Sequence, residues 1–138
     1  MPEKQKMAQK KILVIDDDQF LLDIIKRKLV EAGFAVNSCL EAEKAFDILR
    51  NDHPDIILLD LILPGMDGFE FMRIKNNDPR LADIPVIVIS NLGQQSDIDH
   101  AMELGAKDYI IKANYTPSEF INKINEVANK EKLKIPKP

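Results

Sequence analysis

The chain has 138 residues, 45% of them apolar and 30% charged, and its formal net charge is −4. This composition is typical of a soluble globular protein, and the length suits one domain that buries about two-thirds of its unfolded surface. No apolar run approaches the roughly 20 residues that span a bilayer, and the negative charge gives no general attraction to nucleic acid.

The beginning of the chain shows no export signal. Residues 1–9 form an N-terminal extension that has charges but no apolar stretch of signal-peptide length. Cys39 is the single cysteine, so the chain cannot form an internal disulfide, and we expect a buried structural role for this residue. These features predict a cytoplasmic protein.

Five runs rich in Val, Ile and Leu alternate with stretches of helical period, a pattern typical of a parallel sheet covered by helices. The first, third and fourth runs are apolar throughout, as expected for strands covered on both faces. The second run includes Asn37 and Ser38, so we place it at an edge of the sheet. The predicted strands are residues 12–15, 35–39, 56–59, 86–89 and 109–111.

The predicted helices follow these strands in turn. The first runs from about Asp18 to Gly33, because glycine can take the left-handed conformation at a helix end. Apolar residues at helical spacing predict the second helix over residues 42–49 and the fourth over 98–105. The third helix begins near Asp67.

The fifth helix carries its own start signal. Thr116-Pro117-Ser118-Glu119 is a capping box with proline at the first helical position. Five strand–helix units joined by right-handed crossovers favour a flavodoxin-like, doubly wound α/β fold with five helices and strand order 2-1-3-4-5. This order leaves the second strand at an edge.

Polar residues follow directly on four of the predicted strands. Open parallel sheets bind ligands beyond the carboxyl ends of their strands, where the strand order reverses, here between strands one and three. Asp18 is the expected N-cap of the first helix. The other polar residues at this rim are Asp16 and Asp17 after strand one, Asp60 after strand three, Ser90 and Asn91 after strand four, and Lys112 after strand five.

The carboxylates of Asp16, Asp17 and Asp60 would repel one another at this rim unless a positive charge compensates. Lys112 or a divalent cation can supply that charge. Mg²⁺ favours oxygen ligands such as carboxylates, a backbone carbonyl and a phosphate. The sequence has no His/Cys cluster of the kind that binds zinc, so we expect a Mg²⁺ site.

Four segments resemble the receiver domain of two-component response regulators, in particular the stand-alone type that is similar to chemotaxis regulators. The resemblance covers roughly residues 10–130, taken here as the receiver domain, and leaves 131–138 as a short basic tail. Each motif is weak alone, but the acid pair, the acceptor Asp with its following Pro and Asp-Gly, the hydroxyl and the Lys occur in order at strand ends. The segments are residues 12–18, 60–68, 85–90 and 105–112.

The resemblance implies that Asp60 accepts a phosphoryl group in a Mg²⁺-dependent reaction. It also implies that Asp17 binds the metal directly and that Asp16 assists through a metal-bound water. Asp60 itself and the backbone carbonyl of Ile62 would be further ligands. These roles suit the chemistry, because carboxylates can act as nucleophiles and phosphoryl transfer depends mainly on positioning and charge neutralisation.

The same resemblance implies that Ser90 hydrogen-bonds the phosphoryl group and that Lys112 pairs with a phosphoryl oxygen or, before reaction, with Asp60. Tyr109 would be an aromatic switch residue that responds together with Ser90. The phosphoryl donor would be a sensor histidine kinase, a phosphotransfer protein or a small acyl phosphate. The expected protein is a signalling domain rather than an enzyme, and its catalysis is limited to its own phosphorylation and slow dephosphorylation.

The resemblance also places the output on the surface made by helix four, strand five and helix five. This surface would bind a downstream protein target once it changes on phosphorylation. The residues that follow the fifth helix are too few for a DNA-binding or catalytic domain, so the sequence predicts protein binding, without direct DNA binding or membrane association.

Four residues depart from the usual pattern of this family. Asn91 replaces a small residue after the hydroxyl. Ala113 follows Lys112 where a proline in a cis bond is usual, so the bond is either trans with a rearranged loop or a costly cis bond. Ile62 and Leu92 stand where many members have polar groups. We expect both to flank the phosphoryl group and to slow its hydrolysis, because neither can orient an attacking water.

Three other function classes fit the sequence less well. A phosphatase of the haloacid dehalogenase type needs a second acid where this chain has Ile62. A dinucleotide-binding oxidoreductase needs a Gly-rich turn where the chain has Asp16-Asp17-Asp18. The complete set of acids, hydroxyl and Lys disfavours a pseudo-receiver that binds partners without phosphorylation, and metal-dependent labelling by an acyl phosphate would separate the two.

Overall fold

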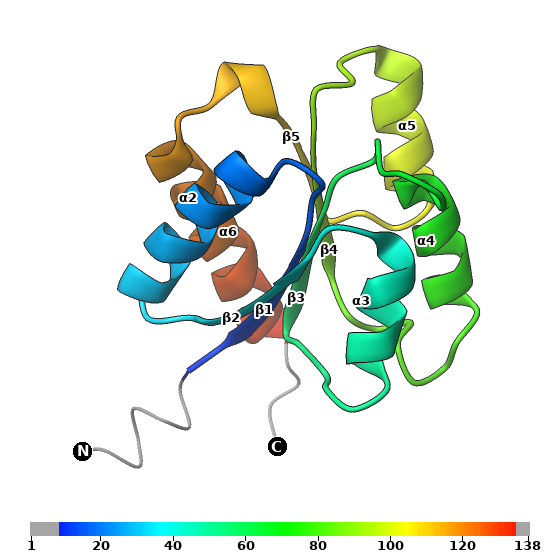
Figure 1. Ribbon diagram of the computed structural model, residues 1–138, viewed down its shortest axis with the longest axis horizontal. Coiled ribbons are helices and arrows are strands. Elements are labelled where there is room, and N and C mark those ends of the chain that lie inside the picture. Colours follow the sequence, from blue (N-terminus) through cyan, green and yellow to red (C-terminus); the bar gives the residue numbers. More distant parts are fainter. Residues whose placement is uncertain (1–8, 135–138) are drawn as a thin grey trace.

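The computed structural model describes residues 9–134, which form a five-stranded parallel sheet with helices on both faces (Figure 1). The strand order is β2-β1-β3-β4-β5, which confirms the predicted flavodoxin-like fold and the edge position of the second strand. Most of the N-terminal extension and the end of the basic tail lie outside the described residues. The strands are β1 (Lys11–Ile15), β2 (Ala35–Cys39), β3 (Ile56–Leu59), β4 (Val86–Ser90) and β5 (Asp108–Ile111).

Five α-helices connect and follow these strands, and a short 3₁₀ helix, η1 (Lys112–Asn114), follows β5. The fourth and fifth helices expected from the sequence are α5 and α6 in this structure. Within residues 9–134, no helix is both long and apolar enough to cross a membrane. The helices are α2 (Gln19–Glu31), α3 (Ala42–Leu49), α4 (Gly68–Asn76), α5 (Gln95–Glu103) and α6 (Pro117–Lys134).

Each face of the sheet has its own hydrophobic core. Successive residues of a strand point to opposite faces, so Ile12 and Val14 of β1 pack with α2 and α6, whereas Leu13 and Ile15 pack with α3, α4 and α5. Figure 1 shows the same division, with α2 and α6 on one side of the sheet and the other three helices on the opposite side. Packing on both faces therefore fixes how the central strands align with one another.

The register of the central strands brings two acidic residues side by side. Ile15 of β1 pairs with Leu59 of β3, and both strands end at this level. The backbone N–H of Asp60 donates to the carbonyl of Ile15 at 2.9 Å, which carries the pairing one residue past the strands. Asp16 and Asp60 thus leave adjacent strands at the same end of the sheet.

The predicted helix boundaries are confirmed where the sequence had capping signals. Asp18 caps α2 by accepting from the backbone N–H of Leu21 at 3.2 Å, and Gly33 after this helix has a φ of +102°. At the start of α6, the Thr116 N–H donates to Glu119 Oε1 at 2.7 Å, and the Glu119 N–H donates to Thr116 Oγ1 at 3.2 Å. These reciprocal bonds are those of a capping box.

Candidate functional site

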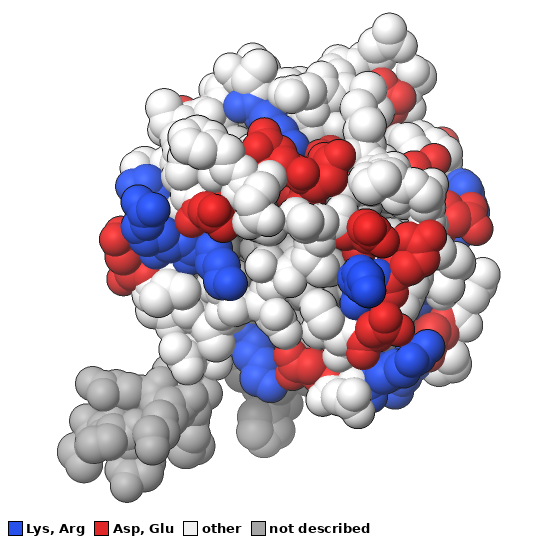
Figure 2. All heavy atoms as spheres, viewed as in Figure 1, with Lys and Arg blue, Asp and Glu red and all other residues white. Residues whose placement is uncertain are grey.

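Three carboxylates meet at the carboxyl ends of β1 and β3. Asp16 is fully buried and Asp60 is only 4% exposed, while Asp17 is exposed to solvent. One carboxylate oxygen from each of the three residues lies within 4.8 Å of the others. Figure 2 shows acidic side chains gathered at the upper end of the sheet, where the strands end in the view of Figure 1. The sequence prediction that these acids converge is therefore confirmed by geometry.

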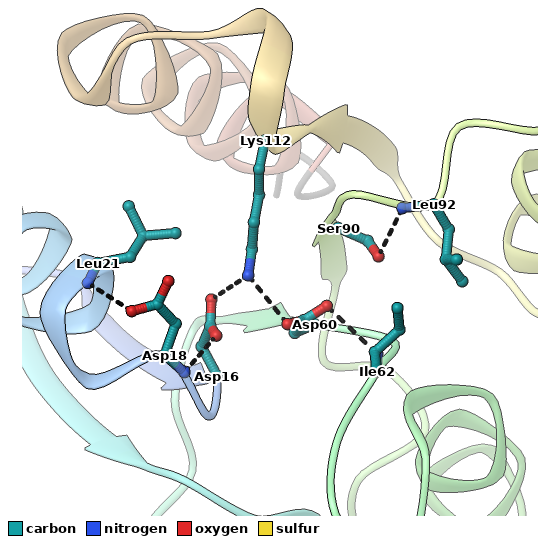
Figure 3. A network of polar contacts seen from close by, with 8 residues as sticks. All are labelled: Asp16, Asp18, Leu21, Asp60, Ile62, Ser90, Leu92 and Lys112. Atoms are coloured by element: carbon teal, nitrogen blue, oxygen red, sulfur yellow. Dashed lines mark hydrogen bonds and ion pairs between the residues drawn. The ribbon is translucent and has the colours of Figure 1, made fainter.

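Lys112 is the first residue of η1 and directly follows β5. Its side chain reaches into the acid cluster (Figure 3). Its Nζ lies 2.9 Å from Asp60 Oδ2 and 2.9 Å from Asp16 Oδ2. The contact with Asp60 is a hydrogen bond, whereas the contact with Asp16 is an ion pair without hydrogen-bond geometry. Lys112 contacts two of the three carboxylates, so the cluster holds more acidic groups than its one ammonium group can balance.

Burial and pairing oppose each other in the ionisation of this cluster. Burial raises the pKa of Asp16 above its ordinary value, and the nearby Lys112 only partly offsets this effect. Burial alone would lower the pKa of Lys112, but its contacts with Asp16 and Asp60 raise it above the ordinary value. Lys112 therefore stays charged at neutral pH, whereas burial works against the charged form of Asp16.

Two backbone amides orient the buried carboxylates. The N–H of Asp18 donates to Asp16 Oδ1 at 2.9 Å, and the N–H of Ile62 donates to Asp60 Oδ1 at 3.3 Å. Asp16 Oδ2 is buried, and apart from the ion pair with Lys112 at 2.9 Å it accepts no hydrogen bond within the described residues. A buried oxygen without a hydrogen bond, beside two further carboxylates, fits a hard divalent cation such as Mg²⁺.

A chain of hydrogen bonds links the end of β4 to β5. Ser90, the last residue of β4, is fully buried, and its Oγ accepts from the N–H of Leu92 at 3.2 Å. The Tyr109 hydroxyl donates to the carbonyl of Leu92 at 2.6 Å, so Leu92 joins both residues through its backbone. Figure 3 shows the Ser90 hydroxyl between Asp60 and Leu92. The two expected switch residues are thus connected through the loop that follows β4.

The two apolar residues expected at the rim, Ile62 and Leu92, differ in exposure. The Ile62 side chain is 54% exposed beside Asp60, as expected for a rim residue. Leu92 is partly buried and packs against the core between the sheet and α3, α4 and α5. That Leu92 flanks the phosphoryl group stays a prediction, and Ile62 is the more exposed of the two side chains.

The structure also resolves the alternatives at Ala113. No cis peptide bond occurs within residues 9–134, so the bond between Lys112 and Ala113 is trans. The chain turns there into η1, which has Lys112 as its first residue. The rearranged loop was thus the correct alternative.

Sequence reasoning missed two backbone features of the site. It identified Asp67 and Gly68 as a helix start, but not the close contact between Gly68 and the backbone of Asp60. It also missed the role of the Leu92 backbone between Ser90 and Tyr109. The glycine after a likely N-cap was the available signal for the first feature, whereas the second depends on the path of a loop.

Comparison with known families identifies the class of protein that this fold and site define. The family model described as "Response regulator receiver domain" matches residues 12–125. The chain belongs to the response regulator receiver domain family, whose members are signalling domains of two-component systems.

Relatives of known name are about twice as long. The chain is 38% identical over 102 residues to the DNA-binding dual master transcriptional regulator RpaA of Synechocystis sp., covering 74% of this chain and 42% of RpaA. It is 36% identical over 124 residues to the phosphate regulon transcriptional regulatory protein PhoB of Pseudomonas aeruginosa, covering 88% and 52%. The chain spans about half the length of the curated relatives that it matches.

A solved structure of a CheY-like receiver domain protein from Methanospirillum hungatei has a TM-score of 0.82 to this chain. The two are 25% identical, and the similarity covers 91% of this chain and 98% of the other. This near-complete overlap with a receiver domain confirms the resemblance inferred from the sequence.

The comparisons give no support to the expectation that DNA binding is absent. RpaA is named as DNA-binding, and PhoB is named as a transcriptional regulatory protein. Because this chain matches only about half of each of them, DNA binding is a property of RpaA and transcriptional regulation a property of RpaA and PhoB, and neither property is assigned to this chain.

Proposed function

We propose that this chain is a phosphorylatable switch in which Asp60 accepts a phosphoryl group with the help of Mg²⁺. One observation carries the proposal: the nearly buried Asp60 carboxylate lies 2.9 Å from Lys112 Nζ and beside the carboxylates of Asp16 and Asp17. This arrangement offers a nucleophile, a fixed positive charge and further acidic groups at one point. It is the combination that transfer of a phosphoryl group to a carboxylate needs.

The reaction uses a carboxylate oxygen of Asp60 as the nucleophile. That oxygen attacks the phosphorus of a phosphohistidine or of a small acyl phosphate, and a new P–O bond forms while the bond from phosphorus to the donor breaks. The bonding electrons leave with the imidazole or the acid of the donor. Lys112, which is 2.9 Å from Asp60 before reaction, is then in reach of an oxygen of the transferred group.

The residues at the site suit a bound Mg²⁺. Asp16, Asp17 and Asp60, with the backbone carbonyl of Ile62, would hold the ion, Asp16 through a water molecule. Bound Mg²⁺ would neutralise charge on the transferred group and on the cluster itself.

The switch begins at Ser90. Its Oγ accepts from the N–H of Leu92, and its hydroxyl hydrogen can turn to donate to a phosphoryl oxygen. A movement of Ser90 toward that oxygen pulls on Leu92 and disturbs the bond between the Leu92 carbonyl and the Tyr109 hydroxyl. We infer that the surface of α5, β5 and α6, where Tyr109 lies, changes as a result and binds a downstream protein.

The partners of this proposal are a sensor histidine kinase or phosphotransfer protein as donor and a protein as target, in the cytoplasm. Labelling with acetyl phosphate tests its chemical part. The chain with Mg²⁺ should gain one phosphoryl group by intact mass, and excess chelator should prevent the gain. Asp17→Asn should reduce it strongly because the metal affinity falls, while Asp83→Asn, an exposed acid elsewhere, should leave it unchanged. Labelling that is indifferent to the chelator would contradict the proposal.

A further inference from the structure

Helix α4 begins directly against the backbone of the proposed phosphoacceptor. Gly68 is the first residue of α4, and its N–H donates to the carbonyl of Leu61 at 2.9 Å. A Cβ atom added at Gly68 would lie 2.6 Å from the carbonyl oxygen of Asp60 and 2.7 Å from the Cα of Leu61. Cβ atoms essentially never approach other heavy atoms closer than 3.0 Å. The helix can therefore start at this place only with glycine.

Neither helix α4 nor the backbone of Asp60 and Leu61 can move easily to relieve this overlap. The two atoms that a methyl group would meet belong to the backbone, so no side-chain rotation relieves the overlap. Phe71 and Met72 of α4 are buried in the core on this face, and Leu61 is buried in the same core. Lifting α4 from the sheet would open voids around these side chains, which is costly. Part of any displacement therefore falls on the segment from Asp60 to Ile62.

That segment contains the groups that the site depends on. Asp60 Oδ2 lies 2.9 Å from Lys112 Nζ, and Asp60 Oδ1 accepts the long bond from the Ile62 N–H at 3.3 Å. The carbonyl of Ile62 is a proposed metal ligand. Mg²⁺ demands a near-ideal octahedral arrangement, so small shifts of two ligands in this segment weaken its binding.

We propose that Gly68 is a positioning residue for the acid site. Its missing side chain lets the start of α4 hold the backbone from Asp60 to Ile62 in the arrangement that binds Mg²⁺. Gly68 touches neither metal nor phosphoryl group and acts only through this backbone. The inference rests on the proposed function, because it assumes that the cluster of Asp16, Asp17 and Asp60 binds Mg²⁺.

The test is the affinity of the full chain for Mg²⁺ alone, without any phosphodonor. Isothermal titration calorimetry, or the amide chemical shifts of residues 60–62 during a Mg²⁺ titration, measures it. Gly68→Ala should bind Mg²⁺ roughly tenfold or more weakly than wild type, as for other residues that orient metal ligands. A glycine that serves only the stability of the fold would lower the melting temperature and leave the affinity unchanged.

Two other glycines provide matched controls. A Cβ at Gly93 would meet only Ile111 Cδ1 at 3.6 Å, an ordinary contact, so Gly93→Ala tests the substitution without an overlap. Gly105 has a φ of +97°, and a Cβ there would meet nothing within 4 Å, so Gly105→Ala adds backbone strain away from the acids. Both variants should bind Mg²⁺ like wild type, and Gly105→Ala should do so despite a lower melting temperature.

The outcomes separate this inference from the proposed function. Absence of Mg²⁺ binding by wild type would contradict the proposed function, whereas equal affinity of Gly68→Ala and wild type would overturn the role of Gly68 alone. If Gly68→Ala does not fold, Asp67→Ala takes its place, since it removes the cap bond to the Glu70 N–H and loosens the same helix start. Unchanged Mg²⁺ affinity in Asp67→Ala would then overturn the inference.

Discussion

Lys112 is the residue on which the charge balance of the acid cluster depends. Its ammonium group lies 2.9 Å from one oxygen of each of the two buried carboxylates, Asp16 and Asp60. Removal of one partner from such a buried pair leaves a charge without compensation, which costs about 3–5 kcal/mol. In the proposed reaction, Lys112 would also exchange its contact with Asp60 for one with the phosphoryl group. The same atom would then serve both the stability of the resting site and the reaction.

Ile62 is the side chain that we expect to set the lifetime of the phosphoryl group. It is 54% exposed beside Asp60 and cannot orient an attacking water. Ile62→Asn adds a group that can position this water. One positioning hydrogen bond of about 1–1.5 kcal/mol, acting fully in the transition state, corresponds to roughly tenfold faster hydrolysis. The decay of phosphorylated protein, measured by intact mass after removal of the donor with Mg²⁺ in excess, gives this rate.

Leu92 supplies the comparison, because its side chain is partly buried and packs against the core. Leu92→Asn should lower the melting temperature and speed the decay less than Ile62→Asn does, because position 92 is less exposed than position 62. Equal decay rates of phosphorylated wild type and Ile62→Asn would mean that Ile62 does not set the lifetime of the phosphoryl group. A faster decay in Leu92→Asn than in Ile62→Asn would show that the loop after β4 rearranges on phosphorylation.

At the scale of elements, the loop between β4 and α5 is held by one side-chain hydrogen bond from β5. Tyr109→Phe removes the hydroxyl that donates to the Leu92 carbonyl at 2.6 Å, and it keeps the ring. We expect a loss of about 0.5–1.5 kcal/mol in the free energy of unfolding. Amide exchange of residues 91–94 should become faster than in wild type, while labelling of Asp60 persists. If these amides exchange at the wild-type rate, the Tyr109 hydroxyl does not restrain the loop.

The start of α6 depends on its capping box. Thr116→Ala removes the Oγ1 that accepts from the Glu119 N–H, and should lower the free energy of unfolding by about 0.5–2 kcal/mol. Ser118→Ala in the same turn is the control, since Ser118 is exposed and should change stability by less. Urea unfolding of both variants measures the difference. A similar loss for the two would mean that the cap contributes nothing specific.

The sequence predicted most elements because their signals are local. The strands were visible as apolar runs, and Asp18 and the Thr116–Glu119 box marked helix starts that the structure confirms. The convergence of the acids followed from their position directly after strands, since parallel strands end on one side of a sheet. The hydrogen bonds of the Leu92 backbone and the contact of Gly68 could not be predicted, because both depend on how a loop or helix packs against distant backbone.

At the scale of the whole molecule, the acid cluster lies at the end of the sheet, between the two helical layers. Lys112 and Tyr109 are close in sequence, yet one contacts the acids and the other the loop before α5. A change at Asp60 can therefore reach the side of the molecule formed by α5, β5 and α6 through few residues. The relatives RpaA and PhoB are about twice as long as this chain, so such a change is described here for the receiver domain alone.

The most direct test of the account is the site of phosphorylation. Wild type, Asp60→Asn and the control Asp83→Asn are each incubated with acetyl phosphate and Mg²⁺, and their intact masses are measured. We predict one added phosphoryl group on wild type and on Asp83→Asn, and none on Asp60→Asn. The same gain in mass on Asp60→Asn as on wild type would contradict the assignment of Asp60 as the phosphoacceptor.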